Sequence, residues 1–174
     1  MLIFGKPYDP HMAQADLNQV IESVFNEIEP SLLRKRIQHE WVPAPEPTFI
    51  RLDERGIHWA LYNLINSCAA ACKEATYGKI KLTVDLSDDE NAVITITDNS
   101  PPSQSGRKED VFSPGVKAPD HKMNPVELAV SRKLIEGHNG TVCLKSSPTG
   151  GNLFLIELPL KQTDPSDTHR SFGS

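Results

Sequence analysis

The chain has 174 residues, a net charge of −5 at pH 7 and a pI near 5.7, and 38% of its residues are hydrophobic. This length fits one domain with its own core, and the acidic charge argues against a nucleic-acid-binding surface. Three cysteines are too few for a disulfide framework, and no apolar run is long enough for a membrane span or a signal peptide. We therefore expect a cytoplasmic protein with reduced thiols.

The first part of the chain is predicted to be a lead-in followed by a helix. Residues 1–15 contain prolines and no clear hydrophobic period, which indicates a lead-in or linker. Asp16 has the character of an N-cap, and apolar residues after it recur with helical spacing. Pro30 predicts a kink or break of this helix near Glu29, because proline removes a backbone hydrogen bond.

Two further helices and six extended segments are predicted downstream. One helix begins after Asp53, and the other begins at Asn124, where the sequence Asn-Pro-Val-Glu supplies an N-cap, a proline and a carboxylate in the first turn. Residues 99–123 are rich in proline and glycine and are predicted to be a long loop, of a kind that is usually functional or mobile. The extended segments have short or alternating apolar patterns: 37–42, 48–52, 79–86, 92–97, 141–146 and 152–160.

This order of elements predicts an α+β two-layer sandwich. Helices are expected to cover one face of a mixed, mostly antiparallel sheet of about five strands. The domain is expected to span residues 16–160. Residues 161–174 are polar and aperiodic, and we expect them to form a disordered tail.

The element order and several local sequences resemble the ATPase domain of sensor histidine kinases, in the superfamily of DNA gyrase, the Hsp90 chaperone and MutL. The resemblance extends over residues 16–160, and it is strong in residues 129–142 (AVSRKLIEGHNGTV) and 150–159 (GGNLFLIELP). It implies a Bergerat-type fold and a site for ATP and Mg²⁺. It also implies partners from two-component signalling: the dimerisation and phosphotransfer helices of a histidine kinase, or the receiver domain of a response regulator. Residues 2–7 (LIFGKP) resemble the family's Leu-x-Phe-Ser-Arg-Pro, which implies that residues 1–15 are a linker or the end of an upstream dimerisation helix.

The family's asparagine motif, Asn-Leu-Leu-x-Asn-Ala, corresponds to residues 63–68, which read NLINSC. Asn63 matches the first asparagine, whereas Ser67 stands where the family has its main magnesium ligand. Asn66 is one position early, which is about 100° around a helix, so it does not point in the same direction. The resemblance makes Asn63, Ser67 and Asn66 candidates for nucleotide binding, and Asn63 and Ser67 candidates for Mg²⁺, although a serine hydroxyl is a weaker ligand than an amide oxygen.

The family's Asp-x-Gly-x-Gly motif corresponds to residues 98–102, which read DNSPP. Asp98 matches the aspartate that accepts a hydrogen bond from the adenine amino group. Both glycines are lost, to Ser100 and Pro102. Together with Pro101, Pro102 fixes the backbone and removes two amide donors, so this loop cannot approach a ligand as the family's loop does.

Two further motifs follow. Residues 111–117 (VFSPGVK) resemble the family's Phe-x-Pro-Phe region, and Lys117 is a candidate phosphate contact. The second glycine-rich motif corresponds to residues 123–129 (MNPVELA), where no glycine remains and Pro125 and Glu127 occupy the helix start. A unit charge about 4 Å from the Glu127 carboxylate is repelled by roughly 1 kcal/mol in water and about 4 kcal/mol at an effective dielectric of 20, so a triphosphate is disfavoured there.

The segments that form the fold thus match the family's sequences, whereas the motifs of the nucleotide site differ from them. We expect a pseudo-ATPase domain of a two-component sensor histidine kinase that acts mainly through protein–protein interaction, and no catalytic residue is assigned. One alternative is a functional ATP-binding domain that phosphorylates a histidine on upstream dimerisation helices. Another is a site repurposed for a different small molecule or for redox sensing through Cys68 and Cys72. The fragment is expected to be monomeric and its parent protein a homodimer.

Overall fold

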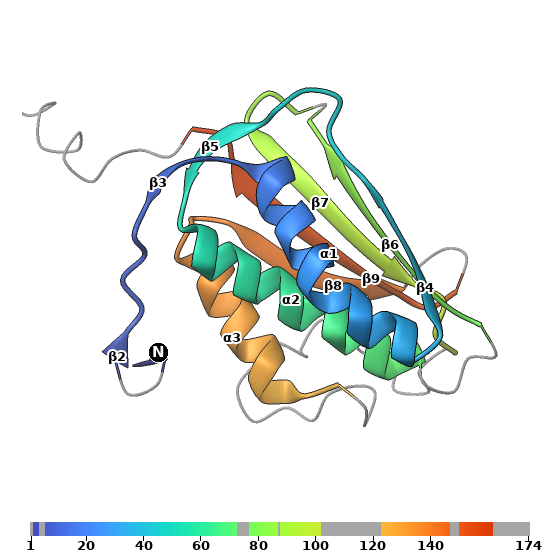
Figure 1. Cartoon of the computed structure of the whole chain (residues 1–174). Helices are drawn as coiled ribbons and strands as arrows, with labels where there is room; N and C mark the ends of the chain where they lie inside the picture. Colours follow the sequence, from blue (N-terminus) through green and yellow to red (C-terminus); the bar gives the residue numbers. More distant parts are fainter. Residues whose placement is uncertain are drawn as a thin grey trace, which may run out of the picture.

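The chain folds into two layers, a sheet and a layer of helices on one of its faces (Figure 1). The structure, a computed structural model, describes residues 2–3, 6–72, 77–86, 88–101, 123–146 and 150–161. The helices are α1 (Leu17–Arg34), α2 (Glu54–Ala71) and α3 (Pro125–Glu136). The main sheet contains, in spatial order, β4 (Ile37–Val42), β6 (Gly78–Asp85), β7 (Asn91–Asp98), β9 (Asn152–Pro159) and β8 (Thr141–Ser146). The predicted α+β two-layer fold is confirmed.

The sheet is mixed because one strand pair is parallel. β4 runs parallel to β6, and the chain returns between them through α2, whereas β6, β7, β9 and β8 pair antiparallel. The inward residues of the β6–β7 hairpin lie opposite one another, as Leu82 does to Ile96. The pairing of Thr97 with Leu153 brings the end of β7 beside the start of β9. Asp98 and Asn152, far apart in sequence, therefore lie next to each other.

The first helix begins where the sequence predicts it, but it does not break at Pro30. The Asp16 carboxylate accepts hydrogen bonds from the backbone N–H groups of Asn18 (3.1 Å) and Thr48 (3.0 Å), so it caps α1. Pro30 lies inside the helix, on its exposed face. The carbonyl that proline leaves without a partner can bind water there, while buried Ile28 and Leu32 hold both sides of the proline on the core.

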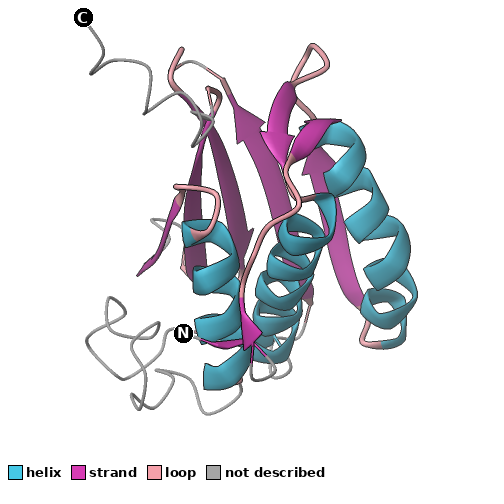
Figure 2. Ribbon diagram, turned by 90° about the vertical axis from the view of Figure 1, so that its left-hand side faces the viewer, coloured by secondary structure: helices cyan, strands magenta, loops and turns pink. Residues whose placement is uncertain are grey.

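The lead-in also differs from its prediction as a linker or helix end, because it contains strands. β3 pairs antiparallel with β5 outside the main sheet, with Ala13 opposite Leu52. In Figure 2 the lead-in descends in front of the helix layer, and a hydrogen bond from the Tyr8 hydroxyl to Asp53 connects it to the domain. The strands outside the main sheet are β1 (Leu2–Ile3), β2 (Lys6–Pro7), β3 (Ala13–Asp16) and β5 (Phe49–Leu52).

The middle helix, α2, lies between α1 and α3 (Figure 1). Its apolar face is fully buried, and it is close enough to α3 for the Ser131 hydroxyl to contact the Ala60 carbonyl at 3.3 Å. Within the part of the chain that the structure describes, no helix is long and apolar enough to cross a membrane. The predicted tail after residue 161 and most of the predicted loop, residues 102–122, lie outside the described residues.

Candidate functional site

Asn63 and Ser67 lie one turn apart on α2 and share a face of the helix. The Ser67 hydroxyl donates to the Asn63 carbonyl at 2.9 Å, a back-bonding geometry common for serine in helices. The Ser67 side chain is 2% exposed. Its short hydroxyl is thus bound to the helix backbone rather than extended toward a ligand. Asn66 is half-buried and lies on a different stripe of α2.

Asn63 is the candidate whose polar group stays available. Its side chain is 7% exposed, and among the described residues its amide forms no hydrogen bond. A buried amide normally has a partner. The Asn63 side chain is therefore suited to meet an external polar group, and its role in nucleotide binding stays a prediction.

Asp98 is enclosed by donors from its own chain. Its side chain is 5% exposed. Its Oδ1 accepts hydrogen bonds from the Ser100 N–H (2.9 Å), the Ser100 hydroxyl (2.6 Å) and the Asn152 N–H (3.0 Å), and its Oδ2 accepts one from the Asn152 side-chain amide (3.1 Å). The same amide donates to the Ser100 hydroxyl oxygen at 3.0 Å. We call these three residues, Asp98, Ser100 and Asn152, the closed carboxylate cluster.

The cluster depends on two residues that the sequence does not mark as partners. A carboxylate offers about four lone-pair sites, and the cluster supplies donors to both oxygens. Ser100, predicted only as a lost glycine, provides two of them. Asn152 was missed. The residue before Asn152, Gly151, is a signal that could have found it. Gly151 has a φ of +85° and lies so close to the Asp98 carbonyl that there is no room for a Cβ atom.

The two cysteines beside the cluster are held as thiols. Burial raises the pKa of Cys68 well above its usual range, and the Asp98 carboxylate raises it further. Burial also raises the pKa of Cys72 to about 11, and its Sγ lies 3.7 Å from Oδ1 of Asn99. Redox sensing needs an accessible thiolate, so this environment argues against it.

The start of α3 has few free backbone donors. Asn124 is its N-cap, as predicted, and its side-chain oxygen accepts from the Val126 N–H at 2.9 Å. Pro125 has no N–H, and Leu128 donates to the Asn124 carbonyl. Glu127 places a carboxylate in the same turn. A phosphate would thus meet a helix end that is already capped and acidic.

Two predicted positions, Lys117 and Pro102, lie outside the described residues, and Pro101 is exposed. The structure therefore brings Asp98 and Ser100 together, with Asn152, and keeps Asn63 and Ser67 one turn apart on α2. In the described ranges no group of three or more His, Cys, Asp and Glu side chains is arranged to hold a metal ion.

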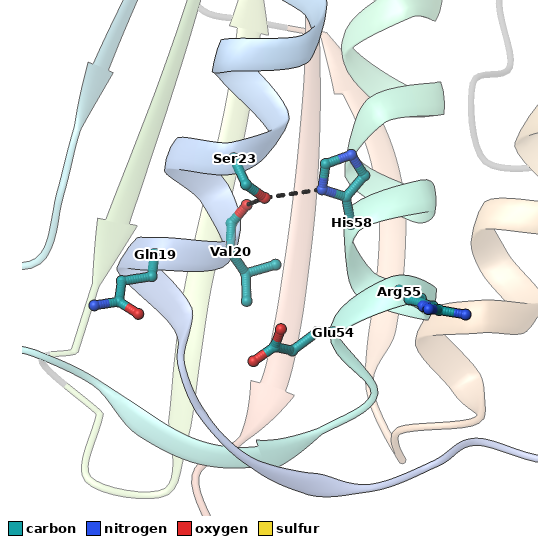
Figure 3. Close-up of a pocket in the computed structure, with 6 residues that line it drawn as sticks. All are labelled: Gln19, Val20, Ser23, Glu54, Arg55 and His58. Atoms are coloured by element: carbon teal, nitrogen blue, oxygen red, sulfur yellow. Dashed lines mark hydrogen bonds between the residues drawn. The ribbon is translucent and has the colours of Figure 1, made fainter.

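A cavity of about 500 Å³ lies between α1 and α2 (Figure 3), and none of the candidate nucleotide residues lines it. His58 crosses this groove: its Nδ1 lies 2.9 Å from the Ser23 hydroxyl and its Nε2 lies 2.5 Å from the Glu27 carboxylate. These residue types occur in hydrolase triads. Here, however, the Ser23 hydroxyl donates to the Val20 carbonyl at 2.8 Å, so it is not directed as a nucleophile. The contacts of His58 with Ser23 and Glu27 therefore join α2 to α1.

Residues 52–162 match the family described as histidine kinase-, DNA gyrase B- and HSP90-like ATPase. This is well over half of the chain, and the chain therefore belongs to this family. The predicted resemblance to the ATPase domain of sensor histidine kinases is confirmed. The degeneracy of the site remains a prediction.

Two curated relatives are sensor kinases. The chain is 24% identical over 152 residues to the adaptive-response sensory kinase SasA of Prochlorococcus marinus, covering 84% of this chain and 40% of that protein. It is 28% identical over 158 residues to the sensory histidine kinase/phosphatase NtrB of Vibrio alginolyticus, covering 84% and 44%. The chain thus spans less than half the length of these relatives.

Solved structures show the same fold. The catalytic domain of the histidine kinase ThkA superposes with a TM-score of 0.76 at 23% identity, covering 88% of this chain and 99% of that one. The Acinetobacter baumannii histidine kinase AdeS superposes with a TM-score of 0.67 at 22% identity, covering 89% and 70%.

Proposed function

We propose that this member of the family is a pseudo-ATPase domain of two-component signalling, which has lost the usual nucleotide site and acts by binding another protein. The observation that carries the proposal is the closed carboxylate cluster. An adenine amino group needs a free lone pair on Asp98, but Oδ1 already accepts three hydrogen bonds and Oδ2 accepts one, so adenine has to share Oδ2 with the Asn152 amide or displace that amide. Displacing a hydrogen bond to a charged group costs about 1.5–3 kcal/mol, which corresponds to roughly a 10- to 100-fold loss of affinity.

The phosphate end of the site supports the same proposal. Pro125 and the Asn124 cap leave few backbone donors at the start of α3, and Glu127 adds negative charge. Val126 in the same turn is 68% exposed, an apolar side chain where the family binds charged phosphates. An exposed apolar residue beside a carboxylate suits a protein surface better than a triphosphate.

The proposed partner is a receiver domain of a response regulator or the dimerisation and phosphotransfer helices of a histidine kinase. A solved relative, the histidine kinase ThkA, was crystallised in complex with the response regulator protein TrrA. That complex gives the class of partner to test first.

Calorimetry with ATP or ADP and Mg²⁺ tests the loss of the site. We expect no binding heat for the wild-type chain at millimolar nucleotide. Glu127→Gln combined with Ser100→Gly removes the repulsion and the hydroxyl donor to Asp98, while the backbone N–H of residue 100 stays, and we expect the double variant to recover measurable affinity. The matched control is Glu136→Gln, which makes the same charge change at the far end of α3. Micromolar binding by the wild-type chain would refute the proposal.

One observation favours the alternative, an ATP-binding domain that phosphorylates a histidine on upstream helices. The available amide of Asn63 lies on α2 where the family binds Mg²⁺ and phosphates. If the chain binds nucleotide, Asn63→Ala should abolish the Mg²⁺ dependence of that binding. Asn26→Ala, an exposed asparagine on α1, is the matched control.

A further inference from the structure

The lead-in carries a tyrosine that is bound to the body of the domain. Tyr8 is half-buried, and its hydroxyl donates to Oδ2 of Asp53 at 3.0 Å. Its ring lies 6.4 Å from the ring of His138, which follows α3. In Figure 2 this part of the chain crosses from β3 down over the helix layer. Tyr8 thus contacts the start of α2 and the end of α3 at once.

Two glycines make the space that the Tyr8 ring occupies. A Cβ atom on Gly137 would lie 2.5 Å from Cε1 of Tyr8, and a Cβ atom on Gly56 would collide with the Tyr8 hydroxyl. Neither glycine has a positive φ, so neither is required by the backbone. Glycine inside a helix, as at Gly56, is less stable than alanine by about 0.5–1 kcal/mol. Glycine at positions 56 and 137 is therefore explained by packing, because a larger residue at either position would collide with Tyr8.

Asp53 and His138 connect the two helices beneath Tyr8. The Asp53 N–H donates to Nε2 of His138 at 2.9 Å, and Nδ1 of His138 lies 2.7 Å from the Leu134 carbonyl. The Asp53 side chain forms no capping bond to α2, and its Oδ2 accepts the Tyr8 hydroxyl. Tyr8 therefore closes a junction that ties the first turn of α2 to the last turn of α3.

We propose that residues 6–12 form a strap, anchored by Tyr8, which fixes the chain on its N-terminal side to the α2–α3 junction and couples its position to α2. Between Tyr8 and the start of β3, no described residue is hydrogen-bonded to the body of the domain. Pro10 and Met12 are half-buried in this segment, and Tyr8 supplies its hydrogen bond to the domain, so we expect loss of the Tyr8 side chain to free the lead-in up to Ala13. α2 also carries Asn63 and Ser67, so a pull on the strap acts on the helix of the candidate site. The strap is independent of whether nucleotide binds.

Backbone ¹⁵N relaxation on the full chain tests the anchor. Order parameters near 0.85 mark a rigid backbone and values below about 0.6 mark a flexible one. We expect residues 9, 11 and 12 to be rigid in the wild type and flexible in Tyr8→Ala. The control Tyr77→Ala removes a tyrosine that is 78% exposed and should leave them unchanged. Flexible residues in the wild type, or rigid ones in Tyr8→Ala, would overturn the proposal.

Measuring Gly56→Ala both in the wild type and in Tyr8→Ala distinguishes the loss of the Tyr8 anchor from a general loss of folding. In Tyr8→Ala, the change Gly56→Ala should raise Tm by about 2 °C, because alanine favours the helix and the methyl group then meets only Oδ2 of Asp53, at 3.1 Å, which Tyr8 no longer holds in place. In the wild type the same change should lower Tm, because the methyl group expels Tyr8. An equal effect in both backgrounds would show that Tyr8 does not occupy this space.

The coupling to α2 has its own readout. We expect Tyr8→Ala to shift the amide resonances of α2 from its first turn as far as Asn63, and Tyr77→Ala to leave them in place. Shifts confined to the first turn of α2 would overturn the coupling.

Discussion

The side-chain amide of Asn152 donates to Oδ2 of Asp98 at 3.1 Å, while its backbone N–H donates to Oδ1 at 3.0 Å. One residue thus binds both oxygens of a carboxylate that the family uses to read adenine. Both groups are buried, so solvent cannot replace either bond cheaply. The pairing has consequences for stability and for nucleotide affinity.

Asn152→Ala should lower the free energy of unfolding by about 1–3 kcal/mol, because it leaves a buried carboxylate with fewer donors. The same variant should raise nucleotide affinity, since Oδ2 becomes free. Urea unfolding measures the first effect and calorimetry the second. Asn91→Ala is the matched control: Asn91 donates to Asp88 over the same 3.1 Å, but at an exposed position, so we expect a change within about 0.5 kcal/mol. Equal costs at the two positions would contradict the role of burial.

Acid should weaken the fold through His138. Burial lowers the pKa of His138 below its usual range, although the Leu134 carbonyl and Asp53 act in the opposite direction. The unfolded chain takes up a proton near pH 6.5, while the folded chain does so only at lower pH. Stability is therefore complete above this value and falls as the pH drops toward the lowered folded pKa, by at most about 1.4 kcal/mol per pH unit.

Urea midpoints measured between pH 7.5 and pH 5 test this dependence. In His138→Gln the slope over this range should decrease, whereas in His11→Gln, an exposed position, it should stay as in the wild type. A slope that is the same in all three proteins would show that another group titrates.

Thiol reactivity should differ between the cysteines. Cys68 and Cys72 are buried with raised pKa values, whereas Cys143 is half-buried. At pH 8 the native chain should therefore react slowly with a disulfide reagent at the first two positions, and all three thiols should react quickly in denaturant. The variant Cys143→Ser identifies any faster native phase. Rapid native labelling at Cys68 or Cys72 would revive the redox hypothesis.

Pro30→Ala should stabilise the domain. Proline inside a helix is unfavourable by up to about 3 kcal/mol, and alanine restores the backbone donor at an exposed position. The rise is measured as a shift of the urea midpoint. Asn26→Ala, one turn earlier on the same exposed face, should change stability by less than about 1 kcal/mol. A loss of stability in Pro30→Ala would mean that the proline has a specific packing role.

Much of the fold follows from local patterns in the sequence. Apolar spacing predicted the three helices, the five strands of the main sheet and β5, but not the strands of the lead-in, and the capping roles of Asp16 and Asn124 are confirmed. These features depend on residues within a few positions of one another, which is why one sequence suffices to find them. The candidate site was predicted in another way, by the resemblance of the sequences around Asn63 and Asp98 to the family's motifs, and it stays a prediction.

Only the tertiary structure decided which distant side chains meet. The register of β7 and β9 places Asn152 on Asp98, across 54 positions of sequence. The packing of α2 against α3 creates the space for Tyr8, and the exposure of Pro30 lets α1 continue through it. Such contacts depend on strand register and helix packing, and these arise from the sum of many weak interactions along the whole chain rather than from any local pattern.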